Sequence, residues 1–194
     1  MVYQFAENII LGGMKLLKEI NTQRILLREI EEKDLYNIYE YASDEDVARY
    51  MPWETHKSLD DTHNFIDTEI EKYKTNTSLN YAIVLKENNK MIGTAGCFEY
   101  KDGDKFAQVG YVINKKYWGM GLVPEAMKAI IEYLFNEKDV HRVYAKHYVG
   151  NEKSGRVMQK LGMKFEGTME DSVFVKGKYI TTKHYAIINP YSNE

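Results

Sequence analysis

Hydrophobic and polar positions follow two rhythms along this chain, one typical of helices and one typical of strands. Apolar residues at helical spacing predict helices over 31–42, 58–74 and 124–136, the second of them capped by Ser58. Runs rich in β-branched and aromatic residues predict strands over 24–29, 81–85, 91–100, 108–114, 142–149, 163–169, 172–175 and 179–188. This order predicts an α/β protein of the mixed α+β kind. We expect one mixed, mostly antiparallel, twisted central sheet of about seven strands, with helices on both faces.

A glycine-containing turn joins the predicted strand 108–114 to the predicted helix 124–136. Its residues are Tyr117, Trp118, Gly119, Met120, Gly121 and Leu122. Backbone N–H groups in such a turn, together with the positive end of the following helix, bind an anion such as phosphate. The alternative is that the two glycines only permit a tight turn. The strand before the turn and the helix after it favour the phosphate site.

Two better-known phosphate loops do not fit these residues. The dinucleotide-binding fingerprint requires a third glycine, and Pro124 stands in its place. A P-loop is approached only at 150–157, where Arg156 replaces the lysine and Val157 replaces the hydroxyl that would hold magnesium. The turn is therefore a different kind of anion site.

The turn resembles the coenzyme A pyrophosphate loop of the GNAT superfamily of N-acetyltransferases, with Lys116 where that family usually has Arg or Gln. The match extends over 117–126 and over a second segment, 151–163. Both segments resemble the branch of ribosomal-protein N-terminal alanine and serine acetyltransferases. The resemblance implies acetyl-CoA as the donor substrate, no metal, and direct attack of a primary amine on the thioester. It also implies a V-shaped splay between two central parallel strands, 108–113 and 142–149.

The same resemblance assigns residues to the cofactor and to the acceptor. The cofactor would contact the turn itself, a strand segment whose backbone N–H binds the oxyanion, and the start of the second segment: Tyr111, Val112, Ile113, Asn151 and Ser154. Ser154 would protonate the leaving thiolate, because Met158 occupies the position of the usual tyrosine acid. The alternative for Asn151 and Ser154 is a plain helix start. Tyr50 and Trp53 lie in a loop that would wall the acceptor site, although a packing role suits them equally.

The general base is not fixed by the sequence. Val173 stands where the ribosomal-protein serine acetyltransferases have a glutamate. Glu99, His147 and Asp171 remain as candidates, with Glu99 first, and a chain of water molecules is a further alternative.

Composition narrows the class of protein without identifying it. The chain has 194 residues, a formal net charge of −3 and a sequence pI near 6.0. We therefore expect neither a nucleic-acid partner nor a membrane partner. Cys97 is the only cysteine, which excludes an internal disulfide and suits a core position in a cytoplasmic protein. We expect residues 1–21 to form an N-terminal extension, 22–194 to form a single GNAT domain, and the protein to be a monomer or a homodimer.

Two functional hypotheses follow. The first is an acetyl-CoA dependent N-acetyltransferase acting on a protein N-terminus or a small-molecule amine. The second is a catalytically weak module that binds acyl-CoA in a sensing or interaction role, because the usual tyrosine and glutamate are missing. The intact turn, Asn151 and Ser154 favour the first.

Overall fold

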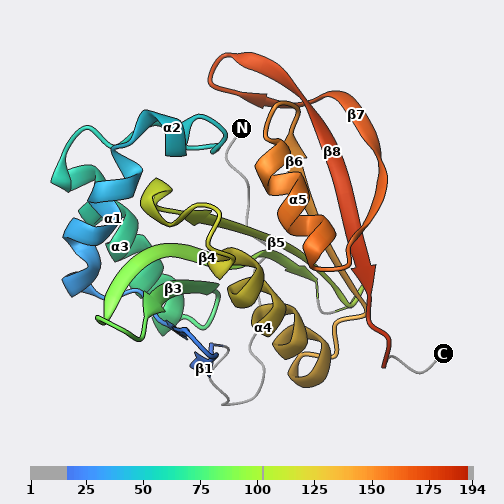
Figure 1. Cartoon of the computed structure of the whole chain (residues 1–194), viewed down its shortest axis with the longest axis horizontal. Helices are drawn as coiled ribbons and strands as arrows, with labels where there is room; N and C mark the ends of the chain where they lie inside the picture. The colour runs from blue at the N-terminus through green and yellow to red at the C-terminus, as the bar shows by residue number, and fades with distance from the viewer. Residues whose placement is uncertain (1–16, 102, 192–194) are drawn as a thin grey trace.

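A computed structural model describes residues 17–101 and 103–191 (Figure 1). Within this part of the chain, eight strands form one sheet in the order β1-β2-β3-β4-β5-β6-β8-β7. The strands are β1 (Ile20–Asn21), β2 (Ile25–Arg28), β3 (Leu79–Leu85), β4 (Lys90–Lys101), β5 (Phe106–Ile113), β6 (Arg142–Tyr148), β7 (Lys164–Val175) and β8 (Lys178–Ile188). The helices are α1 (Leu35–Ala42), α2 (Glu45–Ala48), α3 (Leu59–Lys74), α4 (Leu122–Glu137) and α5 (Glu152–Lys160). The predicted mixed, mostly antiparallel sheet is confirmed.

The structure differs from the predicted elements in its short and irregular parts and in α5, which the sequence indicated only as a helix start at Asn151 and Ser154. β1 has two residues and α2 has four, which is too short for either to show a hydrophobic period. The two strands predicted over 163–169 and 172–175 are one strand, β7, interrupted by an irregularity between Met169 and Val173. Residues 1–16 of the expected N-terminal extension lie outside the described residues, whereas Leu17 is buried in the main core.

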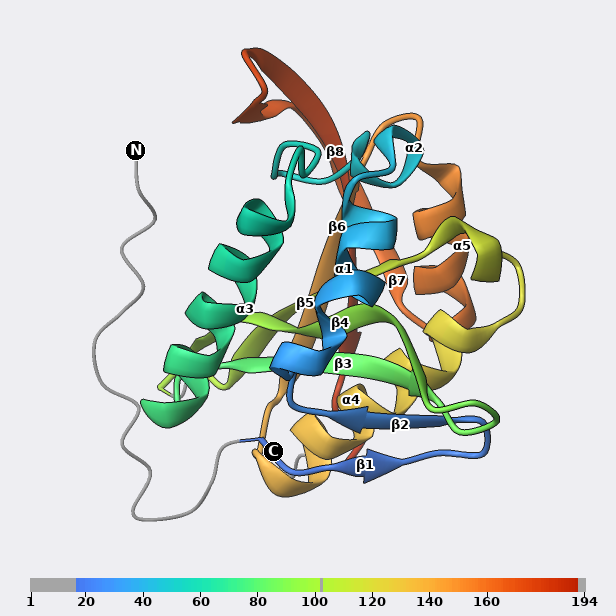
Figure 2. The same ribbon diagram turned by 90° about the vertical axis from the view of Figure 1, so that its left-hand side faces the viewer.

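Helices cover both faces of the sheet (Figures 1 and 2). α4 buries the apolar face predicted for it, comprising Ala126, Met127, Ile130, Ile131 and Leu134, against one face of the sheet. Each such side chain contributes about 1.5–3 kcal/mol on full burial if it is as large as Leu or Met. α1 and α3 pack against β3 and β4 in a second cluster. Ser58 caps α3 as expected, since its side chain accepts from the N–H of Asp61.

The centre of the sheet opens between β5 and β6, the one parallel pair of neighbouring strands in the described sheet. Their pairing runs from Phe106 opposite Arg142 to Gln108 opposite Tyr144 and then stops. β5 nevertheless continues to Ile113 and β6 to Tyr148. Backbone groups on the facing edges beyond Gln108 and Tyr144 therefore lack strand partners. The predicted V-shaped splay is present.

No helix in the described part of the chain is long and apolar enough to cross a membrane.

Candidate active site

The glycine turn leaves a row of backbone donors at the start of α4. Gly119 has φ 81° and Gly121 has φ 75°, in the left-handed region that favours glycine. The N–H groups of Gly119, Met120 and Gly121 bond to no other residue that the structure describes. They lie next to the N-terminus of a 16-residue helix, where the helix dipole favours an anion. The predicted phosphate turn thus has the geometry of an anion site.

Lys116, which precedes this turn, is ion-paired away from it. Its Nζ lies 2.6 Å from Oε1 of Glu40 on α1, and the Nζ of Lys90 lies 2.8 Å from Oε2 of the same carboxylate. Hydrogen bonds from Lys116 and Lys90 lower the pKa of Glu40 to about 2. The ammonium of Lys116 is therefore matched by a carboxylate, and the turn depends mainly on its backbone to bind an anion.

Glu125, in the first turn of α4, ties the glycine turn to the segment between β1 and β2. Its Oε1 accepts from the hydroxyl of Thr22 at 2.6 Å and from the backbone N–H of Arg24 at 2.8 Å. Its Oε2 lies 2.6 Å from Nε of Arg24. Burial acts to raise the pKa of Glu125, but the hydrogen bonds from Thr22 and Arg24 outweigh it and lower the pKa. Sequence reasoning missed this contact because about a hundred residues separate its members.

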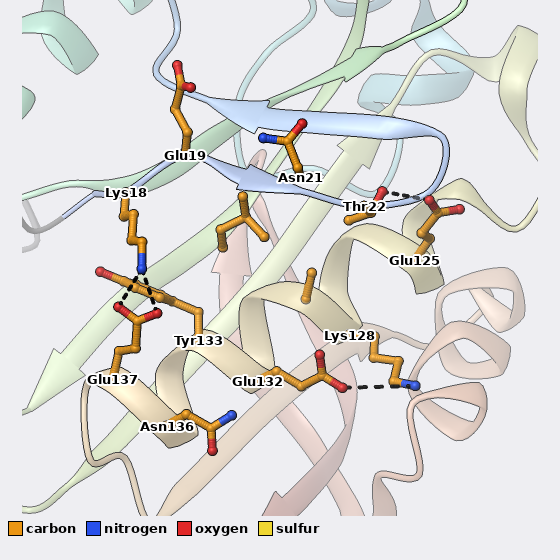
Figure 3. A pocket seen from close by; sticks show the side chains of 12 residues that line it. Lys18, Glu19, Asn21, Thr22, Glu125, Lys128, Glu132, Tyr133, Asn136 and Glu137 are labelled. Atoms are coloured by element: carbon orange, nitrogen blue, oxygen red, sulfur yellow. Dashed lines mark hydrogen bonds and ion pairs between the residues drawn. The ribbon is translucent and has the colours of Figure 1, made fainter.

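A surface cavity of about 520 Å³ lies beside this contact, between β1 and α4 (Figure 3). Its walls carry charges of both signs, with Lys18 paired to Glu137 and Lys128 near Glu132. None of the site residues predicted from the sequence lines it. Hydrogen-bonding groups, and not the size of a cavity, therefore locate the candidate site.

Ser154 and Tyr111, both predicted at the cofactor, meet across the splay. The Tyr111 hydroxyl, from β5, lies 2.9 Å from Oγ of Ser154 on α5 and donates to the Ser154 carbonyl at 3.0 Å. Asn151 is the N-cap of α5, and its side chain accepts from the N–H of Ser154. Burial raises the pKa of Tyr111, which keeps the phenol protonated. Asn151 thus starts the helix, and Ser154 lies at the splay. The two alternatives given for these residues are therefore compatible.

Glu99 lies where β5 and β6 part. Its Oε2 is 2.7 Å from the hydroxyl of Tyr144, which is also 2.9 Å from Oε1 of Gln108. Gln108 and Tyr144 are the last paired residues before the splay. Burial and the Glu99 carboxylate raise the pKa of Tyr144, so that its hydroxyl remains a donor. Of the three predicted base candidates, Glu99 is the one placed at the point of divergence.

His147 and Asp171 occupy different surroundings. His147 is 3% exposed, and its Nδ1 donates to the Tyr148 carbonyl at 2.9 Å. Its Nε2 is buried beneath α5, without a hydrogen-bond partner among the described residues. A Cβ at Gly155 of α5 would lie 2.8 Å from that nitrogen. Asp171 is exposed on the irregular part of β7.

The two predicted acceptor residues divide between the site and the core. The Tyr50 hydroxyl donates to the carbonyl of Gly150 at 3.0 Å, directly before Asn151. Tyr50 therefore lies beside the start of α5. Trp53 packs against the second hydrophobic cluster, with its ring 5.6 Å from that of His56. Packing thus accounts for Trp53 at least in part.

The remaining turn residues link the two helices at the splay. Trp118 donates from Nε1 to the carbonyl of Ile113 at 3.0 Å, and the Nζ of Lys153 on α5 lies 4.2 Å from the centre of its ring. The Trp118 side chain therefore contacts both β5 and α5. Val112 lies on the opposite side of β5, against the second cluster.

A polar chain on β7 and β8 was not predicted. Thr182 Oγ1 lies 2.6 Å from Oγ of Ser172 and 2.8 Å from Nε2 of His184. Burial lowers the pKa of His184, Lys146 lowers it further, and Glu166 opposes the change. The sequence pattern gave no signal for these hydrogen-bonded side chains, because Ser172 and His184 come together only through strand pairing.

Cys97 is buried as predicted, and burial raises the pKa of its thiol to about 12.

Residues 17–101 and 103–191 contain no group of three His, Cys, Asp or Glu side chains that could hold a metal ion. A glycine turn with free N–H groups, a parallel pair of strands that splays, and a serine at the splay define an acyltransferase of the GNAT type. The chain belongs to this family: residues 24–164 match the family described as acetyltransferase (GNAT) domain. The family predicted from the sequence is confirmed.

Individual relatives agree with this assignment. The chain is 33% identical over 169 residues to an uncharacterized N-acetyltransferase of Bacillus subtilis, YnaD, covering 87% of this chain and 96% of that protein. It resembles the crystal structure of a GNAT-family acetyltransferase from Bacillus anthracis with a TM-score of 0.80 and 31% identity, covering 89% and 99% of the two chains. It shares the fold of RimL, a ribosomal L7/L12 alpha-N-protein acetyltransferase solved with coenzyme A. That TM-score is 0.78 at 18% identity, covering 90% and 100%.

Proposed function

We propose that the protein is an acetyl-CoA dependent N-acetyltransferase that acetylates a primary amine, either a protein N-terminus or a small-molecule amine. The observation that carries the proposal is the juxtaposition of free N–H groups at 119–121 with the splay that holds Ser154. The first provides for a pyrophosphate, and the second for an extended thioester arm. Coenzyme A joins those two chemical groups in one molecule.

The backbone of the splay would hold the donor. Unpaired groups on the facing edges of β5 and β6 would bond to the amides of the pantetheine arm. An N–H in the segment 111–113 would donate to the oxyanion that forms as the amine attacks the thioester carbonyl. Asn151 and the residues 117–122 would contact the rest of the cofactor. These assignments follow the predicted site and the observed geometry.

Proton transfer would use Ser154 and Glu99. The amine lone pair forms the new C–N bond, the oxyanion collapses, and the C–S bond breaks with the electron pair on sulfur. Ser154 Oγ would give the thiolate its proton, and the Tyr111 hydroxyl, which donates to the Ser154 carbonyl, lies 2.9 Å from the same oxygen. Glu99 would take the proton that the amine loses, directly or through water. The products are an amide and the free thiol of coenzyme A.

The residues expected on the acceptor side suit an amine substrate but do not identify which amine. Glu99 brings a carboxylate to the point of divergence, and Tyr50 stands beside the start of α5. A carboxylate near the reacting carbon attracts a protonated amine. We place the reaction in the cytoplasm and expect the fold, including β1 and the buried Leu17 that lie before residue 22, to act as one domain. A monomer or a homodimer suits this proposal.

The second candidate function is an acyl-CoA binding module. Two observations favour it: Met158 is 2% exposed in the core where a tyrosine acid is usual, and Val173 carries no carboxylate. Such a protein would bind the donor and release it unchanged.

Free thiol release distinguishes the two functions. The protein would be incubated with acetyl-CoA and a panel of small amines and peptides with free N-termini, and thiol would be followed with a chromogenic reagent. We expect release that depends on one acceptor class, with a mass gain of one acetyl group on that acceptor. Binding of acetyl-CoA by calorimetry, without thiol release above hydrolysis for any acceptor, would overturn the enzyme and support the binding module.

A further inference from the structure

Arg24 lies against the glycine turn from the direction of β2. Its Nη1 donates to the carbonyl of Met120 at 2.9 Å, while its Nε is held by Glu125 at 2.6 Å. Its Nη2 lies 3.6 Å from the position that a Cβ at Gly121 would occupy. Two guanidinium nitrogens thus bond to the turn and to α4, and the third lies near Gly121. Glu125 is itself fixed by Thr22, as the dashed line in Figure 3 shows.

The hydrogen bond to Met120 controls the direction of the next N–H. In a trans peptide the C=O and the following N–H point in opposite directions. Because Arg24 holds the Met120 carbonyl on its own side, the Gly121 N–H is directed to the opposite side of the turn. That N–H bonds to no described residue. Arg24 therefore orients a donor that the turn offers to an anion.

Arg24 also balances the charge around the turn. Glu125 is the acidic residue in the first turn of α4, where its charge lies close to any anion bound at the helix start. The two lysines directly before the turn do not offset this charge, since Lys115 is 2.6 Å from Asp44 and Lys116 is 2.6 Å from Glu40. Arg24 is thus the cation paired with Glu125. Its side chain is 46% exposed, so it remains accessible to a ligand.

We infer that Arg24 is a positioning residue for the pyrophosphate of the donor: through Glu125 and the Met120 carbonyl it holds the turn so that the Gly121 N–H faces the phosphate. This inference rests on the proposed function. Arg24, nearly a hundred positions before the turn in the sequence, thus holds the turn in place. Lys116, which directly precedes the turn, does not do so. The predicted consequence is selective, because only the phosphate-bearing part of the donor depends on the turn.

Two donors test this selectivity. Acetyl-CoA carries the pyrophosphate, whereas S-acetylpantetheine has the same thioester arm without it. We expect Arg24→Gln to raise KM for acetyl-CoA by about 10- to 100-fold, the range for losing a charge-assisted hydrogen bond. We expect kcat with acetyl-CoA and kcat/KM with S-acetylpantetheine to stay within about 2-fold. Arg24→Lys is expected to rescue little, because an ammonium cannot reproduce the forked contact to Glu125 and Met120.

Matched variants control for folding. Arg49→Gln removes an arginine that forms a surface pair with Asp46 at 3.2 Å, and it should leave both donors unaffected. Arg24→Gln combined with Glu125→Gln should recover part of the acetyl-CoA affinity, since it removes the unpaired carboxylate from the helix start. Equal losses with both donors, or no loss with acetyl-CoA, would overturn the inference.

Failure of the proposed function gives a different result. If the wild type transfers acetyl from neither donor, the enzyme proposal fails. Calorimetry with coenzyme A then still tests the role of Arg24. We expect Arg24→Gln to weaken coenzyme A binding by the same 10- to 100-fold. Coenzyme A binding that is unchanged in Arg24→Gln would overturn the inference in that case too.

Discussion

At the scale of single residues, the proposed proton transfer depends on a pair of hydroxyl groups at the splay. Tyr111 comes from β5 and Ser154 from α5, and their oxygens are 2.9 Å apart. Since burial raises the pKa of Tyr111, the phenol donates and does not ionise. Because that single O–H donates to the Ser154 carbonyl at 3.0 Å, the Ser154 hydroxyl is the donor across the 2.9 Å contact, and Tyr111 thereby orients it.

Ser154→Ala tests that chemistry. We expect kcat to fall by about 10²-fold, the lower range for a general acid, while KM for acetyl-CoA changes by less than about 3-fold. Initial rates and the pH profile of kcat would be measured with the acceptor found above. Ser43→Ala, which removes a hydroxyl that bonds to the Tyr39 carbonyl at the end of α1, is the control and should leave kcat unchanged. An unaltered kcat in Ser154→Ala would show that Ser154 is not the acid.

The position of α5 is set at the scale of elements by a close contact with β6. Gly155 lets the helix approach His147, whose ring stacks on Tyr185 with centroids 5.8 Å apart and is fixed by the Tyr148 carbonyl. The ring cannot move aside cheaply, because it is buried and its Nδ1 is bonded. The glycine thus determines how near Ser154 comes to β5.

Gly155→Ala should therefore destabilise the fold. A Cβ would lie 2.8 Å from His147 Nε2, and such overpacking costs about 1–3 kcal/mol in the free energy of unfolding. Urea denaturation would measure it. Gly103→Ala is the matched control, because a Cβ there meets nothing within 4 Å. His147→Ala should relieve the clash, so the double variant would lose less than the sum of the two single losses. Strict additivity would contradict this account.

A carboxylate on α1 links that helix to the turn before α4. Glu40 bonds to Lys116 at 2.6 Å and to Lys90 on β4 at 2.8 Å. Its pKa is lowered from 4.5 to about 2, so its stabilisation is fully present above about pH 4.5 and is lost as the pH falls toward 2. The contact joins α1 to the residue that directly precedes the glycine turn.

Glu40→Gln should show this pH dependence. At pH 7 we expect a loss of about 1 kcal/mol in the free energy of unfolding, a modest value because the pair is partly exposed. The difference from the wild type should shrink as the pH is lowered from 4.5 toward 2, measured by urea denaturation at several pH values. Glu71→Gln, which breaks an exposed pair with Lys74 at 2.6 Å within α3, serves as the control and should cost less. A loss that stays constant down to low pH would rule out the ion pairs as its cause.

At the scale of the whole molecule, sequence patterns predicted the features that are formed by residues close together in the sequence. The apolar face of α4, the Ser58 cap and the glycine turn are local, and each is present. The eighth strand was not counted, because β1 consists of two residues.

Contacts between distant segments had no sequence signal. Tyr111 and Ser154 are 43 positions apart, and Arg24 and Met120 are 96 apart. Such pairs meet only after the sheet orders its strands. The site was predictable where it is made of consecutive backbone and not where it is made of paired side chains.

The splay itself leads to a prediction about the whole sheet. Beyond Gln108 and Tyr144, backbone groups on the facing edges of β5 and β6 lack partners, whereas β3 and β4 are paired along their length. If the donor fills the splay, coenzyme A should slow hydrogen exchange at 109–113, at 145–148 and at the turn 119–122. Exchange in β3 should change little.

The measurement is hydrogen–deuterium exchange by mass spectrometry with and without coenzyme A, with pantetheine as the control. Pantetheine should protect the strand edges and leave the turn unprotected, since it carries no pyrophosphate. Protection of the turn by pantetheine, or of β3 and β5 alike by coenzyme A, would show a general tightening of the fold in place of local filling of the splay.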